Sequence, residues 1–216
     1  MEIENGRTSR HILEAFQQSE AAYQSNPRSV LPAFSNELRE MGFEFETLYH
    51  AIILTKTHGT RIAPLALKYY QQATLVNEKR YLLSWLPKQA ASSAIPVLLQ
   101  DFYSDKGNVD RWAIADTLYG FGSPKYWQDY INIISKSEYG IDRQMLILLV
   151  GKLKIDAAIP VLISLLEDEC VTLHALCALS RYKMPELREC FERFVNSSNM
   201  TWRKQAIKAL HQLSKR

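Results

Sequence analysis

The chain has 216 residues, of which 47% are hydrophobic and 23% are charged. This composition is typical of a globular protein and argues against an intrinsically disordered chain. The 26 Lys and Arg residues exceed the 23 Asp and Glu residues by three, so the charge balance permits an acidic protein or a nucleic acid partner without requiring either.

The N-terminal sequence MEIENGRTSR is polar and lacks the apolar core of a signal peptide. The longest purely apolar run, Met145 to Val150, is too short to cross a bilayer. The three cysteines, Cys170, Cys177 and Cys190, cannot all pair within the chain, and we expect them to be reduced. We therefore expect a cytoplasmic protein without a membrane segment, a metal ion or a cofactor.

The pentapeptide AIPVL occurs twice, at residues 94–98 and 158–162. Halving the interval between the two copies gives a spacing of about 32 residues, which is within the range of repeat proteins. Positions at this spacing are Pro32, Pro64, Pro96, Gln128 and Pro160. Proline is tolerated in the first turn of a helix, where its missing N–H has no intrahelical partner to lose. Each of these positions therefore predicts the first turn of a helix.

A second set of repeated positions follows the first about fifteen residues later. Its members are Thr47, Lys79, Arg111 and Arg143, and then Thr172 and Arg203. Apolar or small residues tend to follow each member after three, six and seven residues, which places them on one face of a helix. The interval is three residues shorter between Pro160 and Thr172, where the turn around Glu167 absorbs the difference.

These two sets predict an all-α chain in which helices alternate with short turns, because no segment shows the strict alternation of a half-buried strand. Residues 1–28 are expected to form a capping segment, and residues 29–216 a single array of helix pairs. In chain order, the predicted pairs are 30–41 with 46–57, 63–73 with 78–86, 94–103 with 109–120, 125–136 with 142–152, 157–166 with 171–182, and 186–195 with 201–213.

Segments 94–99, 109–118 and 202–210 resemble the short variety of HEAT repeats, which belong to the armadillo-like α-solenoids. The resemblance covers residues 29–216 and implies a right-handed α–α superhelix of about six helical hairpins. In that family an Asp in the turn and an Arg or Lys at the start of the second helix form a polar ladder between repeats. Asp105 and Arg111 match this pair, whereas Arg143 and Arg203 have no acidic residue at the same offset.

The chain has no Gly-rich phosphate loop, paired-cysteine zinc motif, His-Glu-x-x-His or Gly-x-Ser-x-Gly. We therefore expect no enzymatic activity and no catalytic residue. The resemblance implies a scaffold or adaptor whose second helices line a concave groove for a protein or peptide, with the oligomeric state left open. The predicted groove residues are Arg80, Trp112, Asp116, Tyr119, Gln144, Arg143, Lys204 and Lys208.

Trp112, Asp116 and Tyr119 stand at positions i, i+4 and i+7, so their side chains share one face of a helix. Two interpretations remain open. Trp112 either packs into a neighbouring helix, with Asp116 solvated or paired, or it is an aromatic anchor of the kind that dominates binding hot spots.

An alternative function comes from a second resemblance, to the HEAT-like alkylpurine DNA glycosylases. In that family a Trp and an Asp four residues apart hold the damaged nucleotide, and an Arg on a following helix contacts DNA. Trp112 and Asp116 match that spacing, and Arg143 is the candidate for the basic residue. The resemblance is confined to one helix, and the chain lacks the basic excess expected for phosphate contacts.

Overall fold

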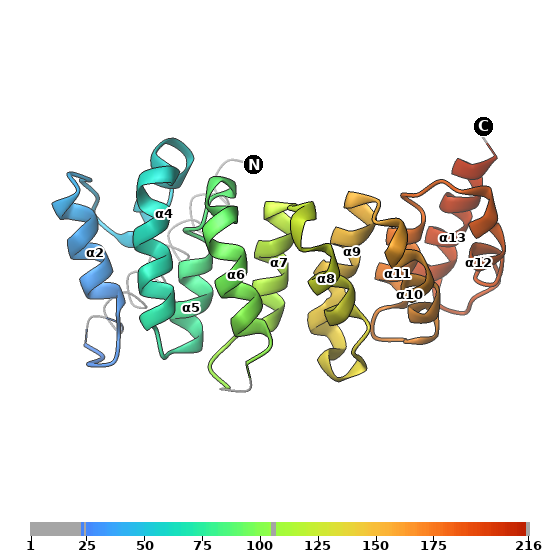
Figure 1. The fold of residues 1–216 in the computed structure, drawn as a ribbon, viewed down its shortest axis with the longest axis horizontal. Helices are drawn as coiled ribbons and strands as arrows, with labels where there is room; N and C mark the ends of the chain where they lie inside the picture. The colour runs from blue at the N-terminus through green and yellow to red at the C-terminus, as the bar shows by residue number, and fades with distance from the viewer. Residues whose placement is uncertain (1–22, 24, 105–106, 215–216) are drawn as a thin grey trace, which may run out of the picture. The chain divides into compact units, whose positions relative to one another are not determined.

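The computed structural model describes residues 23, 25–104 and 107–214 (Figure 1). These residues form helices, 3-10 turns and loops, and none of them is in a β-strand, which confirms the predicted all-α fold. None of the described helices combines the length and the apolar character needed to cross a membrane. The predicted capping segment 1–28 lies mostly outside the described residues, as does Asp105 of the predicted ladder. The chain divides into two compact units, Met1–Asp110 and Arg111–Arg216.

The first unit is built around α4, which packs against α2, α5 and a 3-10 turn. Its core centres on Phe34, which is fully buried and meets the rings of Tyr69 and Trp85 edge-on at 5.6 and 5.0 Å. The elements are α2 (Leu31–Glu40), α3 (Leu48–Ala51), α4 (Leu54–Gln72), α5 (Val76–Leu83), the 3-10 turn Lys88–Ala90 and α6 (Ala91–Phe102).

The predicted helix 46–57 is not continuous, because residues 48–51 form the single turn α3 and residues 54–57 already belong to α4. The segment is rich in β-branched residues, which lose side-chain freedom in a helix. The hydroxyl of Thr55 also donates a hydrogen bond of 2.8 Å to the carbonyl of Ile52, which competes with helical pairing. A second interruption follows at His58, whose φ of −122° and ψ of 17° are not helical.

The prolines at the repeated positions do not all begin helices. Pro32 and Pro160 lie in the first turn, as predicted. Pro64 and Pro96 lie inside α4 and α6 instead, because each helix begins further upstream than the pattern indicated. The predicted helices 63–73 and 94–103 are therefore confirmed, but with starts that are too late.

The second unit alternates longer and shorter helices. Its elements are α7 (Arg111–Phe121), α8 (Trp127–Ile134), α9 (Gln144–Leu153), α10 (Ile159–Ser164), α11 (Thr172–Leu179), α12 (Arg188–Glu192) and α13 (Met200–Leu213). The 3-10 turns of this unit are Pro124–Tyr126, Ser137–Arg143, Asp156–Ala158, Leu165–Glu167 and Pro185–Leu187. The predicted helices of residues 109–213 are thus confirmed, with ends shifted by a few residues and several first turns in 3-10 geometry.

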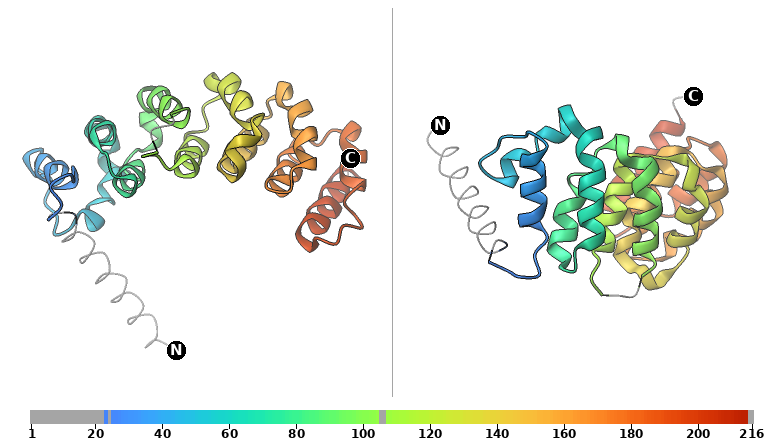
Figure 2. Two further views of the ribbon diagram at one scale, coloured as in Figure 1. Left: turned by 90° about the horizontal axis from the view of Figure 1, so that it is seen from below. Right: turned by 60° about the vertical axis from the view of Figure 1, so that its left-hand side comes forward.

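Helices α7, α9, α11 and α13 pack side by side in chain order, and we call them the B layer. Helices α8, α10 and α12 each pack on the B-layer helix that follows them, and we call them the A layer. Figure 2 shows these helices from two further sides, coloured from green through yellow and orange to red. Consecutive segments of this unit therefore pack as helical hairpins.

The predicted burial pattern is confirmed in the second unit. Side chains three, six and seven residues after Arg143 and after Thr172 are all fully buried. Leu162 of the second AIPVL copy is fully buried too, like Leu98 of the first copy in the other unit. Packing is closest between α9 and α11, because a Cβ added to Gly151 would lie 2.6 Å from the Cα of Ala178.

Candidate functional site

The outer face of the B layer consists of the B-layer side chains that remain accessible at the same register in successive helices. On α7 these are Trp112, Asp116 and Tyr119, while the residues between them face the core: Ala113, Ile114, Ala115 and Leu118 are buried. Gly122 terminates α7 with a left-handed φ of 63°, and its N–H donates to the carbonyl of Leu118 at 3.1 Å. The three side chains therefore lie on a short helix whose C-terminal end is defined by Gly122.

Trp112 is 37% exposed, so part of its surface is accessible to a partner. Asp116 is exposed one turn further along, and it has no hydrogen bond or ion pair with the part of the chain that the structure describes. An accessible tryptophan beside an exposed carboxylate is the arrangement that the second interpretation of this helix face, an aromatic anchor, requires.

Tyr119 is half-buried and is joined to the next B-layer helix by Lys152. The Nζ atom of Lys152 lies 4.4 Å from the centroid of the Tyr119 ring and donates a hydrogen bond of 3.1 Å to the Tyr119 carbonyl oxygen. A cation over an aromatic face is attracted by the ring electrons. Lys152 therefore ties the C-terminal end of α7 to that of α9.

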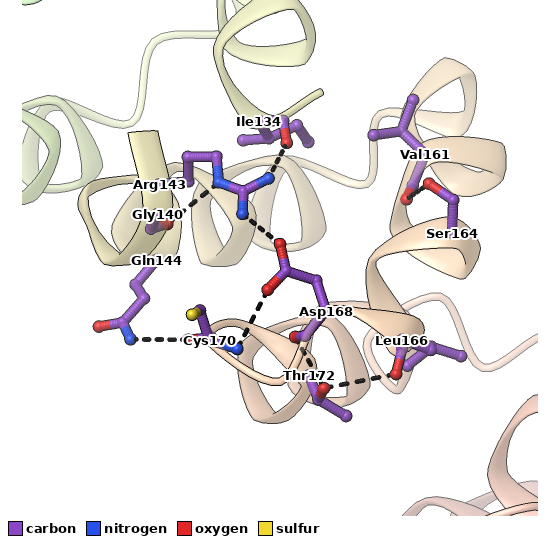
Figure 3. A network of polar contacts seen from close by, with 10 residues as sticks. All are labelled: Ile134, Gly140, Arg143, Gln144, Val161, Ser164, Leu166, Asp168, Cys170 and Thr172. Atoms are coloured by element: carbon purple, nitrogen blue, oxygen red, sulfur yellow. Dashed lines mark hydrogen bonds and ion pairs between the residues drawn. The ribbon is translucent and has the colours of Figure 1, made fainter. Parts of the chain in front are cut away.

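Arg143 lies in the interior, at 1% exposure, and does not reach the outer face as the sequence predicted. Its guanidinium donates to the carbonyls of Gly140 and Ile134, each at 3.0 Å, and forms an ion pair with Asp168 (Figure 3). Arg143 has no acidic residue at the offset of the Asp105–Arg111 pair, but it has an acidic partner elsewhere in the sequence. The partner comes from the turn before α11, 25 residues away.

Asp168 also accepts a hydrogen bond of 3.1 Å from the backbone N–H of Cys170. Partial burial raises the pKa of Asp168, but the hydrogen bonds from Arg143 and Cys170 outweigh burial, so the pKa lies below its usual value. Asp168 is therefore ionised at neutral pH and balances the buried Arg143 charge, which fixes α9 against the start of α11.

The remaining predicted groove residues lie at several places. Gln144 is half-buried and its side-chain amide donates to the carbonyl of Cys170 at 3.1 Å. Lys204 and Lys208 are exposed on α13. Arg80 belongs to the first unit, where its Nη1 atom lies 3.6 Å from Oδ2 of Asp110. Only the predicted residues from 111 onward, apart from Arg143, therefore contribute to the outer face of the B layer.

Within residues 23, 25–104 and 107–214, no group of three His, Cys, Asp or Glu side chains is arranged to hold a metal ion. His174 is half-buried, and burial lowers its pKa. The cysteines are free thiols, of which Cys170 is exposed and Cys177 half-buried.

Sequence reasoning missed several cations that follow the B-layer helices. The segments Lys152-Leu153-Lys154 and Arg181-Tyr182-Lys183 occupy the same positions relative to the repeated positions Arg143 and Thr172. The signal was the matched register of two basic pairs, 29 residues apart, in a protein with only a small overall charge.

Comparisons with protein-family models, with curated proteins and with solved structures give no significant match to this chain. Its function must therefore be inferred from the side chains of the B layer.

Proposed function

We propose that the protein is a non-enzymatic interaction module that binds a protein or peptide partner on the outer face of the B layer. The observation that carries the proposal is Trp112, a large aromatic side chain that stays 37% exposed on a helix whose opposite face is fully packed. Exposed aromatic residues on rigid elements supply much of the binding energy in protein interfaces. Asp116, one turn away, supplies a charge that orients a partner.

Rigidity of the B layer supports this function. The Arg143–Asp168 ion pair holds the start of α11 against α9, and the close approach of Gly151 to Ala178 holds the same two helices further along. Because these contacts exist before a partner arrives, little conformational entropy is lost on binding.

We further propose that the helical hairpins belong to a HEAT-like α-solenoid, in a cytoplasmic protein. Polar links between a second helix and the helix pair that follows it support this assignment. Lys79 pairs with Asp101 at 2.5 Å, between α5 and α6, and Arg143 pairs with Asp168 between α9 and α11. Both basic residues belong to the second set of repeated positions, Lys79 within the first turn of α5 and Arg143 directly before α9, where the resemblance implies a polar ladder.

The alternative, an alkylpurine DNA glycosylase, is weakened by Arg143. Trp112 and Asp116 are both accessible, but the arginine that would contact DNA is buried and paired with Asp168. We therefore expect no release of alkylated bases from duplex DNA by the wild-type protein. Base release that is lost in Asp116→Asn would establish the glycosylase instead.

The proposal is tested by affinity capture from the source cell with wild type, Trp112→Ala and Trp127→Ala. Trp127 is a matched control, because it is also 37% exposed but lies on α8 in the A layer. We expect a partner captured by wild type and by Trp127→Ala to be reduced at least about tenfold with Trp112→Ala, as for a hot-spot residue. Equal capture by all three proteins would refute the proposal. Circular dichroism must show that both variants keep the wild-type helix content.

A further inference from the structure

A pocket of about 460 Å³ opens at the C-terminal ends of α9 and α11, beside α13. Half of its ten lining residues are basic and none is acidic. The basic residues are Lys152, Lys154, Arg181, Lys183 and Lys208. They come from three successive B-layer helices and the turns that follow them, so the packing of the layer, and not one basic stretch of sequence, brings these charges together.

Several cations elsewhere in the described chain have carboxylate partners. Lys68 is paired with Glu37, Lys79 with Asp101, Arg143 with Asp168 and Arg193 with Glu167. In the pocket Lys152 donates to a backbone carbonyl, and the side chains of the other four cations have no ion pair or hydrogen bond with any residue that the structure describes. The negative ends of the helix dipoles attract these cations, but they do not remove the mutual repulsion of five like charges.

Two of the lysines occupy a backbone conformation that favours glycine. Lys154 has a φ of 52° and Lys183 a φ of 54°, both in the left-handed region. The corresponding position after α7 is Gly122, with a φ of 63°. A side chain at positive φ is strained relative to glycine, so local backbone preference does not explain why lysine stands at these two positions. The positive charge of the side chain explains why lysine stands there, if the pocket binds an anion.

Cys177 lies near two of the pocket cations, Arg181 and Lys208. It lines the pocket and is half-buried. Burial raises the pKa of its thiol, and the positive charges of Arg181 and Lys208 oppose that rise. Arg181, which follows α11, and Lys208 on α13 therefore both lie close enough to act on the Cys177 side chain.

We propose that this pocket binds an acidic segment of the partner, with neighbouring Asp or Glu carboxylates received by Lys154, Arg181, Lys183 and Lys208. The inference rests on the proposed function and names the chemistry of the partner. Lys152 lines the pocket, and its Nζ atom lies over the ring of Tyr119. Tyr119 is two helical turns, about 10 Å, from Trp112 along α7. An extended peptide of about four residues spans that distance, so one segment reaches both the pocket and the exposed tryptophan.

An acidic peptide fits this surface better than nucleic acid does. Nucleic acid binding requires cations spread along a phosphate backbone, whereas these cations converge on one pocket of a size that suits a small ligand or a few side chains. On the same outer face, Asp116 is exposed without a cationic partner among the described residues. That carboxylate repels a phosphate backbone, but it is compatible with the apolar or basic end of a peptide.

The test is fluorescence anisotropy with fluorescein-labelled hexaglutamate, and with labelled hexalysine and a labelled twelve-nucleotide thymidine strand as comparisons. We expect wild type to bind hexaglutamate below about 1 mM and to bind hexalysine not at all. The double variant Lys154→Gln, Lys183→Gln should lose at least about tenfold in affinity, and so should Lys208→Gln. Lys125→Gln, an exposed lysine in the 3-10 turn before α8 and outside the pocket, is the matched control and should stay within about twofold.

Alkylation of the native cysteines gives a second readout on the unmodified protein. Hexaglutamate at saturation should slow the alkylation of Cys177, which lines the pocket, while Cys170 is the internal control. Equal rates at Cys177 with and without the peptide, no detectable binding, or pocket variants with wild-type affinity would each overturn the proposal. Tighter binding of the thymidine strand through the same lysines would overturn it in favour of nucleic acid.

Trp112→Ala separates this inference from the proposed function, because hexaglutamate carries nothing to contact the tryptophan and should bind this variant within about twofold of wild type. If hexaglutamate fails to bind while partner capture still depends on Trp112, only the acidic-segment inference falls. If hexaglutamate binds through the lysines while capture is indifferent to Trp112, the pocket stands and the proposed function falls.

Discussion

Asp168→Asn tests how the B layer is held together. The substitution keeps the shape of the side chain and an oxygen that accepts a hydrogen bond, but it removes the countercharge of Arg143. The Arg143 side chain is 1% exposed and that of Asp168 28% exposed. Removing one partner of a buried ion pair costs roughly 3–5 kcal/mol. Because solvent reaches Asp168 in part, we expect a loss of about 2–3 kcal/mol in the free energy of unfolding.

Urea denaturation followed by far-UV circular dichroism measures this loss. With a slope of roughly 1–3 kcal/mol per molar urea, the unfolding midpoint should fall by about 1 M or more. Asp116→Asn is the matched control, because this aspartate is exposed, and its effect should stay within about 0.5 kcal/mol. Equal midpoints for the two variants would refute the structural role assigned to the Arg143–Asp168 pair.

The same variant should change how stability depends on pH. The pKa of Asp168 in the folded protein lies below its ordinary value of 3.8, because hydrogen bonds from Arg143 and Cys170 outweigh the effect of partial burial. A lowered pKa contributes stability above the unfolded value, and that contribution is lost as the pH falls through the folded value. The stability difference between wild type and Asp168→Asn should therefore shrink below about pH 4. A difference that stays constant into strong acid would contradict this assignment.

Five further substitutions test the packing and the strained turns. Leu162→Ala should cost about 2–5 kcal/mol in urea denaturation, because the side chain is fully buried; a neutral effect would contradict the repeat register. Gly151→Ala should cost about 1–3 kcal/mol because its Cβ meets the backbone of α11. Gly120→Ala has open space around its Cβ and should stabilise α7 by about 0.5–1 kcal/mol. A Gly120→Ala variant less stable than Gly151→Ala would disprove the close approach of α9 to α11. Lys154→Gly and Lys183→Gly should each stabilise the folded protein by about 0.5–1 kcal/mol and so raise its melting temperature, even though each weakens hexaglutamate binding. Lower melting temperatures would show that no backbone strain is relieved.

The helices of the second unit could be predicted from sequence because local signals agree there. Arg143 and Thr172 each precede apolar residues at helical spacing, and every side chain in those two patterns is fully buried. In the first unit the same reasoning failed at 46–57. The apolar spacing gave no warning of the hydrogen bond from Thr55 to Ile52 or of the interruption at His58.

The candidate site was only partly predictable. The shared face of Trp112 and Asp116 follows from helix geometry alone. The position of Arg143 does not, because its partner Asp168 lies 25 residues away and meets it only through the packing of α11 on α9. The lysine pocket depends on left-handed turns at Lys154 and Lys183, where sequence rules expect glycine, so the basic residues after α9 and α11 were not recognised as one cluster.

Site-specific photocrosslinking in the source cell tests the central claim most directly. Benzoylphenylalanine replaces Trp112 on α7 in one protein and Trp127 on α8 in another, two positions with the same 37% exposure in different layers. If the outer face of the B layer binds a partner, irradiation should yield one adduct of discrete mass from position 112 and none from position 127. Adducts from neither position, or the same adduct from both, would contradict the account.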